Sequence, residues 1–120
     1  SVPAVAALEA ALHELEDQGG VPARRAHYAA LNARLRAGLI GLGLAIRNGG
    51  PDSAVSLTVA QLPHGLTFDT FYNDLRARGF LVYRGKGPVS HDAFLVANMG
   101  DLDLATIDRF LEAVATISEL

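Results

Sequence analysis

The sequence has no cysteine and no tryptophan, and Lys86 is the single lysine among its 120 residues. Without cysteine there is neither a disulfide framework nor a thiolate site, so the cytoplasm is the default compartment. No apolar run approaches the roughly 18 residues of a membrane-spanning helix, and no charged segment followed by an apolar run resembles a signal peptide. The chain begins with Ser1 rather than Met, so we expect a trimmed chain or a piece of a longer polypeptide.

Charged residues are also few, at 19% of the chain, and the net charge is −3. Such a chain offers no basic surface, so neither nucleic acid nor an anionic membrane is expected as a partner. Half of the residues are hydrophobic, many of them alanine. This surplus indicates apolar surface that meets a partner. The length fits one domain that buries a little over ~60% of its unfolded surface.

Patterns that bind metals or carry out catalysis are missing as well. The four histidines form neither an HExxH motif nor a helical pair four residues apart: His13, His27, His64 and His91. A zinc site therefore has little support. The consecutive Ser90-His91-Asp92 cannot act as a catalytic triad, because adjacent side chains cannot meet in that geometry. We assign no catalytic residue and no metal ligand.

Two helices are expected at the start of the chain. The segment Pro3–Asp17 opens with proline and stops at Gly19-Gly20, and a second helix spans residues 22–41. Leucines at helical spacing give each helix an apolar stripe: Leu8, Leu12 and Leu15 in the first, and Leu31, Leu35 and Leu39 in the second. Two helices joined by a Gly-Gly turn predict a helical hairpin made of residues 1–20 and 21–43.

The remainder, residues 44–120, mixes strands and helices. The expected strands are a short one at 44–47 and others at 54–62, 80–83 and 94–98. The expected helices run from Thr67 to Arg78 and from Asp103 to Leu120, and Thr67 and Asp103 are expected to cap them. In the strand at 54–62, Val55, Leu57 and Val59 alternate with small or polar residues, so one face is apolar. This order predicts one α+β domain with a small three- to four-stranded sheet covered by helices on one side.

The loop Gly85–Asp92 is the one segment that combines flexible backbone, a cation, a histidine and a hydroxyl. Lys86 lies between two glycines, and the surrounding residues lack the pattern of a Walker phosphate loop. A flexible lysine suits contact with an anionic ligand such as a carboxylate or phosphonate. A solvated hairpin tip accounts for the same residues, and from local chemistry alone it is the simpler interpretation.

Two of these segments resemble a known family in their order and spacing. Phe80–Lys86 (FLVYRGK) and Phe94–Asp101 (FLVANMGD) resemble the C-terminal small domain of class V pyridoxal-phosphate aminotransferases, where they read roughly RGF-IYPGK and FRIGNMGD. They are most similar to the 2-aminoethylphosphonate–pyruvate transaminase branch. The opening Ser1-Val2-Pro3, the residues 16–20 and the helix 25–42 resemble the same family, so the likeness covers nearly the whole chain.

The resemblance implies that residues 1–120 form the small domain of a fold-type-I enzyme of phosphonate metabolism. The complete enzyme would move an amino group between 2-aminoethylphosphonate, or a related amine, and a small keto acid such as pyruvate. Pyridoxal 5′-phosphate would be bound by a lysine of a large domain outside this chain, and Lys86 matches a different family lysine. The chain alone would then be inactive, and its apolar surface would meet the large domain and a partner in a homodimer.

The sequence departs from the family at the residues that grip the substrate. The arginine of FRIG, which holds a carboxylate in a bidentate fork, falls on Leu95, the following glycine on Ala97, and the proline of YPGK on Arg84. Either the substrate lacks that carboxylate, or Arg84 or Lys86 binds it instead, or amino transfer has been lost. Arg84 and Lys86 are therefore the candidate substrate-binding residues. A different cofactor-dependent activity and a non-catalytic assembly domain remain alternatives.

Overall fold

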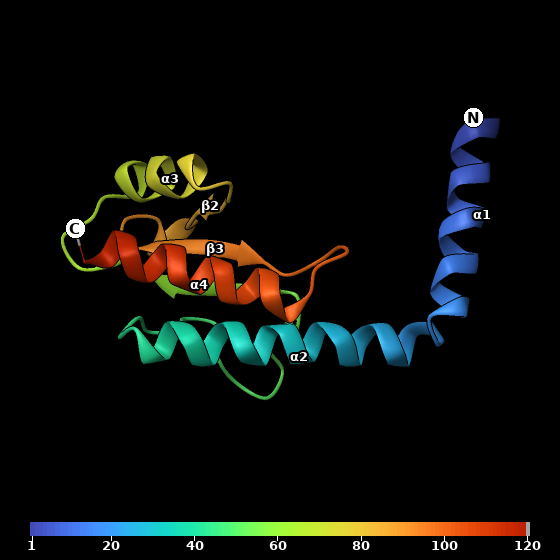
Figure 1. Ribbon diagram of the computed structural model, residues 1–120, viewed down its shortest axis with the longest axis horizontal. Helices are drawn as coiled ribbons and strands as arrows, with labels where there is room; N and C mark the ends of the chain where they lie inside the picture. Colours follow the sequence, from blue (N-terminus) through green and yellow to red (C-terminus); the bar gives the residue numbers. More distant parts are fainter. Residues whose placement is uncertain (120) are drawn as a thin grey trace.

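The computed structural model describes residues 1–119, and Leu120, the expected end of the last helix, lies outside them. Its elements are α1 (Val2–Asp17), α2 (Gly20–Gly41), β1 (Leu57–Gln61), α3 (Phe68–Ala77), β2 (Tyr83–Arg84), a 3-10 turn (Gly87–Val89), β3 (Ala93–Ala97) and α4 (Leu104–Ser118). The predicted α+β class is confirmed, and Figure 1 shows the strands lying among α2, α3 and α4. The expected caps are present, because the side chains of Thr67 and Asp103 accept hydrogen bonds from the first turns of α3 and α4.

The sheet is antiparallel, with β3 in the middle and the order β1-β3-β2. The expected strand at 44–47 is reduced to one bridge, between Ile46 and Ala60. The strand expected at 54–62 begins only at Leu57, because side chains occupy the preceding carbonyl groups. Arg36 donates to the carbonyl of Ala54 and Asn98 to that of Val55, so these residues do not join the ladder.

The core lies between one face of the sheet and the helices. Its fully buried members include Leu31, Leu35 and Leu39 of α2, Phe71 and Leu75 of α3, Phe94 of β3, and Val114 and Ile117 of α4. The rings of Phe71 and Phe94 meet at 4.7 Å between centroids, which joins α3 to the central strand. Leu104, at the first turn of α4, is 51% exposed and lies outside this core.

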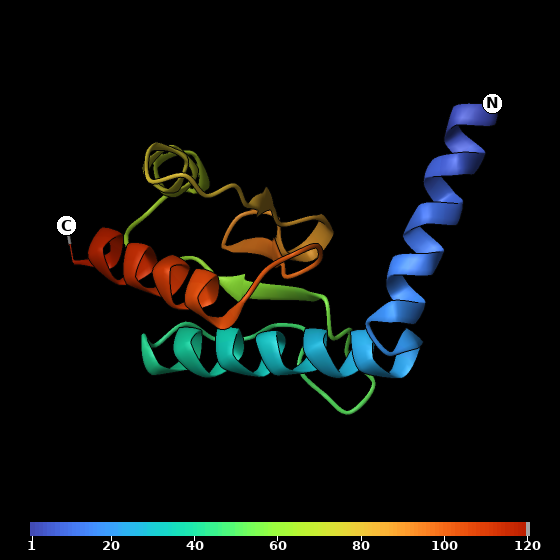
Figure 2. The ribbon, with the colours of Figure 1, turned by 45° about the vertical axis from the view of Figure 1, so that its right-hand side comes forward.

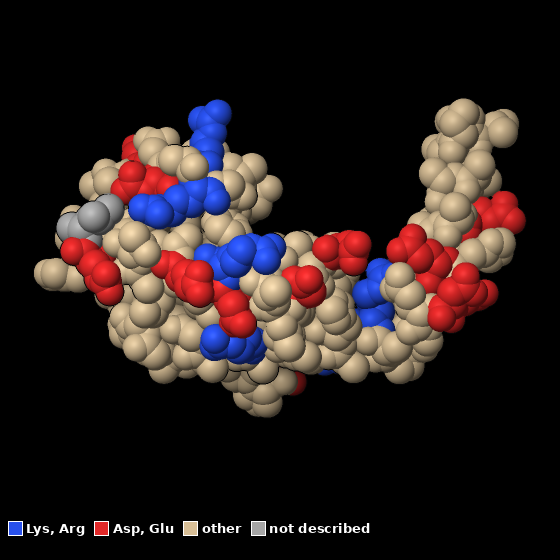
Figure 3. All heavy atoms as spheres, viewed as in Figure 1, with Lys and Arg blue, Asp and Glu red and all other residues tan. Residues whose placement is uncertain are grey.

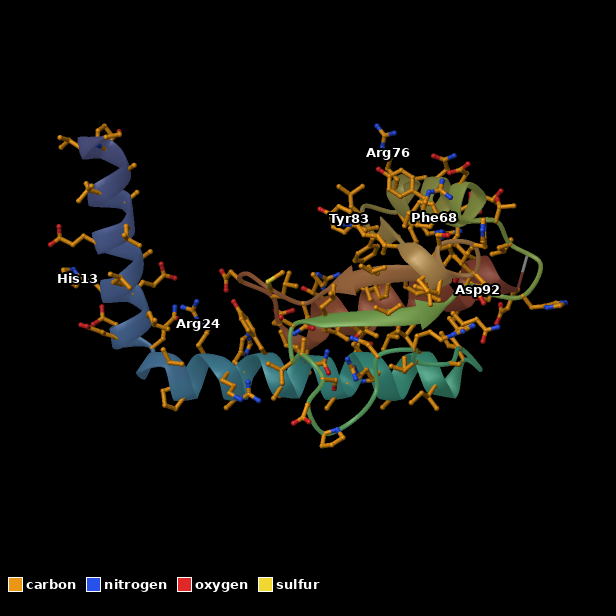
Figure 4. The ribbon with its side chains drawn as sticks, turned by 180° about the vertical axis from the view of Figure 1, so that it is seen from behind. His13, Arg24, Phe68, Arg76, Tyr83 and Asp92 are labelled. Atoms are coloured by element: carbon orange, nitrogen blue, oxygen red, sulfur yellow. The ribbon has the colours of Figure 1, made fainter. Side chains whose placement is uncertain are left out.

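Helices cover only one face of the sheet, as predicted. Thr58 and Ala60 of β1 are fully buried on that face, whereas Leu57 and Val59 are half-buried on the other. The small and polar side of β1 therefore packs toward the helices, and its larger apolar side is left open. Figures 1 and 4 view the molecule from opposite sides: α4 lies in front of the strands in one, and no helix does in the other.

The predicted helical hairpin is wrong. Two consecutive residues with positive φ, Gly19 at 104° and Gly20 at 82°, turn the chain so that α1 leads away from the domain instead of folding back along α2. Figures 1 and 2 show α1 projecting in both views. No residue of α1 is buried, and Leu8 and Leu12 of its apolar stripe are 60% and 50% exposed.

Candidate functional site

The connection between β2 and β3 is a compact loop rather than a loose hairpin tip. Gly85 is buried where its N–H donates to the carbonyl oxygen of Ala93, at 3.1 Å. A Cβ at position 85 would overlap the carbonyl oxygen of Val89, so the close backbone approach requires glycine. The 3-10 turn then follows, with Lys86 as its N-terminal flanking residue.

Lys86 is the exposed cation of this loop. Within residues 1–119, no hydrogen bond or ion pair joins its ammonium group to another side chain. The lysine is therefore available to an anion that approaches the loop. A loop that contacts only solvent would also leave its lysine exposed. The geometry therefore agrees with an anion-binding lysine and with a solvated loop.

Arg84 is occupied by contacts with α3. Its guanidinium lies 2.6 Å from a carboxylate oxygen of Asp69 and 4.6 Å above the ring centre of Phe68. Arg84 pairs with Phe94 in the ladder, and neighbouring residues of a strand face opposite sides. Arg84 therefore lies on the helix-covered face of the sheet, together with Phe94. Phe68, whose ring Arg84 contacts, is labelled on α3 in Figure 4.

Leu95 lies on the other side of the sheet. It pairs with Tyr83 on β2 and with Val59 on β1, so these three side chains cross the open face in one row. We call the set Leu57, Val59, Tyr83, Leu95 and Ala97 the open sheet face. The structure therefore separates the candidate Arg84 from the position that aligns with the family's arginine, because Arg84 and Leu95 belong to opposite faces.

A buried polar cluster was missed from the sequence. Asn98, at the end of β3, is fully buried and donates to the carbonyl oxygens of Tyr28 and Val55, each at 3.1 Å. Its side-chain oxygen accepts from Asn32 of α2 at 3.3 Å, and Asn32 also donates to Thr58. This cluster fixes the end of β3 to α2. In the sequence, the only sign of this cluster is an asparagine at the end of an apolar strand.

A polar hollow of about 200 Å³ lies in the corner between α1 and α2. Its lining residues are Glu14, Gln18, Arg24, His27, Gly100 and Asp101. Arg24 donates to the Gln18 side chain at 2.8 Å, and Nε2 of His27 lies 2.9 Å from the carbonyl oxygen of Leu102. Figure 3 shows acidic side chains gathered near this corner, while the N-terminal end of α1 carries none on that face. Among residues 1–119, no three metal-ligating side chains cluster.

The single lysine is exposed in its loop, and it lines neither the corner hollow nor the neighbouring apolar hollow between Leu15, Tyr28 and Met99. None of the helices in residues 1–119 has both the length and the apolar character needed to cross a membrane.

Comparison with known proteins gives a consistent result, although no family model matches the chain. The chain is 36% identical over 99 residues to a 2-aminoethylphosphonate–pyruvate transaminase of Lysinibacillus sphaericus, which covers 82% of this chain and 27% of the relative. It is 37% identical over 112 residues to the 2-aminoethylphosphonate–pyruvate transaminase 1 of a Polaromonas species, covering 92% and 30%. The chain therefore spans about a third or less of the length of these relatives.

Solved structures share the fold. Alanine–glyoxylate aminotransferase from Nostoc sp. superposes with a TM-score of 0.83 over 92% of this chain and 30% of that protein, at 19% sequence identity. These matches confirm the resemblance and the fold type expected from the sequence.

Proposed function

Because this chain is homologous over most of its length to one part of the 2-aminoethylphosphonate–pyruvate transaminases, we propose that it is the C-terminal small domain of a pyridoxal-phosphate-dependent aminotransferase. The observation that carries the proposal is the 31–37% identity to these enzymes over 82–96% of the chain. Residues 1–120 form one domain of the complete polypeptide, and a large domain holds the cofactor.

The cofactor is bound outside this chain. Pyridoxal phosphate needs a lysine in an enclosed pocket, and the described residues offer one exposed lysine without such a pocket. When bound, the cofactor supplies the electron sink for amino transfer. The small domain contributes surface that contacts the substrate and closes the site, and by itself it is inactive.

Two exposed apolar surfaces support a large partner domain in the same polypeptide. One is the stripe of α1, where Val2, Val5, Leu8 and Leu12 are 83%, 64%, 60% and 50% exposed. The other is the open sheet face, where Tyr83 is 67% exposed and the remaining four residues are half-buried. A contiguous apolar surface of this kind marks an interaction site in a small domain. A homodimer, as the family resemblance implies, would cover further parts of the same surfaces.

For the substrates, the relatives indicate 2-aminoethylphosphonate or a related amine as donor, and a small carbonyl compound, pyruvate in the relatives' names, as acceptor. Lys86 is the better of the two candidate binding residues, because no ion pair or hydrogen bond to a side chain engages its ammonium group within residues 1–119. Arg84 would first have to leave Asp69 and Phe68, and it shares a face with Phe94 rather than with Leu95.

The test uses the complete polypeptide that contains this chain. After addition of pyridoxal phosphate, the proposal expects a protein-bound cofactor absorption band, and 2-aminoethylphosphonate should then convert that band in a single half-reaction. Residues 1–120 alone should show neither effect. Absence of cofactor binding by the complete polypeptide would favour a non-catalytic assembly domain. Cofactor binding with no response to any amine would favour another pyridoxal-phosphate activity, for which the leucine at position 95 is the supporting observation.

A further inference from the structure

We propose that Asn48-Gly49 is a modification site, where the backbone nitrogen of Gly49 converts Asn48 to aspartate or isoaspartate, and that the fold restrains this reaction through β1. Asn48 is the asparagine that precedes a glycine. The others precede larger residues: Asn32, Asn73 and Asn98. Glycine has no Cβ, so its nitrogen can approach the preceding side chain with the least crowding. The modification needs neither a cofactor nor a substrate, and it therefore does not depend on the proposed function.

The reaction joins the two neighbouring residues in a ring. The nitrogen of Gly49 bonds to Cγ of Asn48, the bond from Cγ to Nδ2 breaks, and Nδ2 leaves as ammonia with the proton from Gly49. Water then opens the resulting cyclic imide at either of its carbonyl groups. One opening gives aspartate, and the other gives isoaspartate, in which the main chain runs through the side-chain carbon. Water is the only reagent consumed, so no oxidant or reductant is needed.

In the fold, the side chain of Asn48 takes the place of a peptide group beside β1. Its Nδ2 donates to the carbonyl oxygen of Leu57 at 2.9 Å, and its Oδ1 accepts from the N–H of Val59, also at 2.9 Å. In a continued antiparallel ladder, backbone groups would make these contacts. Gly49, in contrast, is exposed, and its N–H donates no hydrogen bond within residues 1–119. The structure therefore holds the group that is attacked and leaves the attacking nitrogen free.

Ring closure requires these hydrogen bonds to open. Nδ2, the atom that leaves, is the donor to Leu57, and attack on Cγ draws the amide away from Val59. Arg36 of α2 adds to the restraint, because it donates to the carbonyl oxygen of Asn48 at 3.3 Å and to that of Leu57 at 3.0 Å. The two hydrogen bonds that must open first should slow the reaction about 10- to 100-fold relative to the unfolded chain.

The product cannot restore the same contacts. A carboxylate at position 48 has no N–H to offer to the carbonyl oxygen of Leu57, which then keeps Arg36 as its donor. Isoaspartate in addition lengthens the main chain at this position. Because Leu57 is the first residue of β1, the segment that precedes the strand would separate from it more often. A single opening that ends in ring closure therefore becomes a permanent change in the chain.

The test compares the reaction in the folded complete polypeptide and in the same polypeptide unfolded by guanidinium chloride, at one pH and temperature. Mass spectrometry of peptides assigns the mass increase from amide to carboxyl to its residue, and an isoaspartate methyltransferase labels the isoaspartyl product. We expect Asn48 to react in the denaturant, and about 10- to 100-fold more slowly in the folded polypeptide. Asn73 is exposed on α3 and precedes Asp74, so it serves as the internal reference and should react far less than Asn48 in the denaturant.

Three variants separate the site from its restraint. Gly49→Ala should slow the reaction in the denaturant by crowding the nitrogen, and it leaves the contacts of Asn48 in place, because a Cβ at position 49 meets nothing within 4 Å. Arg36→Lys removes the guanidinium and should speed the reaction only in the folded polypeptide, with circular dichroism confirming the fold. Ser53→Ala removes a hydroxyl that accepts from Arg36 at 3.3 Å. It should act in the same direction, and it covers the case in which Arg36→Lys does not fold.

Three results would overturn the inference. Equal rates for Asn48 in the folded and the unfolded polypeptide would show that the fold does not restrain the reaction. An Asn48 that stays unmodified in the denaturant would show that this pair is no modification site. A folded-state rate that neither Arg36→Lys nor Ser53→Ala changes would show that the contacts around β1 do not control it.

Discussion

Arg36 of α2 donates a hydrogen bond from Nε to the hydroxyl oxygen of Thr58 on β1, at 3.1 Å. The same hydroxyl, fully buried, accepts a second hydrogen bond from Asn32 at 3.2 Å. The other donors of Arg36 reach the carbonyl oxygens of Asn48 and Leu57, and the Ser53 hydroxyl, among others. One guanidinium therefore fastens the irregular segment before β1 to α2 through neutral oxygens.

The first prediction concerns Thr58. Thr58→Val keeps the shape of the side chain but leaves donors of Asn32 and Arg36 without their shared acceptor. We expect a loss of about 1–3 kcal/mol in the free energy of unfolding, measured by urea denaturation. Thr58→Ser retains the hydroxyl and should lose clearly less free energy of unfolding. Equal losses for the two variants would mean that the hydroxyl contributes no more than the methyl group, which would contradict the prediction.

The second prediction concerns the contact of α2 with α4. A Cβ at Gly38 would overlap the side chain of Leu111, whereas nothing lies near a Cβ at Gly41. Replacing glycine by alanine in a helix normally favours the helix by roughly 0.5–1 kcal/mol. We therefore expect Gly41→Ala to be neutral or stabilising and Gly38→Ala to destabilise by about 1–3 kcal/mol. Thermal unfolding compares the two, and a stabilised Gly38→Ala would contradict the close packing.

The third prediction concerns the stability of the protein at acid pH. Hydrogen bonds from the hydroxyl and the backbone N–H of Thr106 lower the pKa of Asp103 below its usual value of 3.8. A lowered folded-state pKa means that the cap stabilises the protein above pH 3.8 and that this contribution is lost as pH falls through the folded-state value. The difference in unfolding temperature between wild type and Asp103→Ala should therefore be constant above pH 3.8 and shrink below it.

Asp103→Asn serves as the control for that series. An asparagine caps a helix without titrating. The difference in unfolding temperature between Asp103→Asn and Asp103→Ala should therefore not change with pH in the acid range. If wild type and Asp103→Asn respond to acid identically, the carboxylate of Asp103 does not account for the pH dependence.

The fourth prediction separates the two candidate substrate-binding residues. If the complete polypeptide has the proposed activity, Lys86→Ala in it should raise KM for the anionic substrate, because the substitution removes a cation that has no side-chain partner within residues 1–119. Arg84→Ala should leave KM unchanged and cost at most about 1 kcal/mol of stability, since its ion pair with Asp69 is exposed. Steady-state kinetics decide between them. An increase in KM for Arg84→Ala alone would restore the interpretation that Arg84 replaces the missing fork.

The fifth prediction concerns the apolar stripe of α1 in residues 1–120 alone. Leu8→Ser and Leu12→Ser remove apolar surface that is exposed rather than buried. We expect both to reduce self-association and binding of a hydrophobic dye, while the free energy of unfolding changes by less than about 0.5 kcal/mol. Leu35→Ser, at a fully buried position of α2, is the contrasting variant and should destabilise strongly.

The sequence predicted those parts of the fold that depend on local chemistry. Thr67 and Asp103 cap the helices they were expected to cap, since an N-cap needs only its own side chain and the next turn. It did not predict which face of β1 is covered. Alternation shows that two faces differ, but only the packing of α2 and α4 decides that the side of Thr58 is the buried one.

The sequence predicted the loop between the last two strands, but not the directions of the side chains beside it. The loop with Lys86 lies where the glycines and the flanking strands place it. The direction of Arg84 depends on strand register, and a shift of one residue moves a side chain to the opposite face. Because β2 has only two residues, the sequence could not show that Arg84 faces α3 and that Tyr83 lies beside Leu95.

The isolation of α1 has a thermodynamic consequence. Of the 16 residues of this helix none is buried and Leu15 is half-buried, so its own hydrogen bonds and propensity supply most of its stability. Isolated helices only slightly shorter are already marginal in water. The amide protons of α1 should therefore exchange with deuterium through local fraying, far faster than those of α4, whose opening requires the core to unfold. Covering the stripe of α1 would slow that exchange, so the protection of these amides is a direct gauge of whether the helix has met its partner.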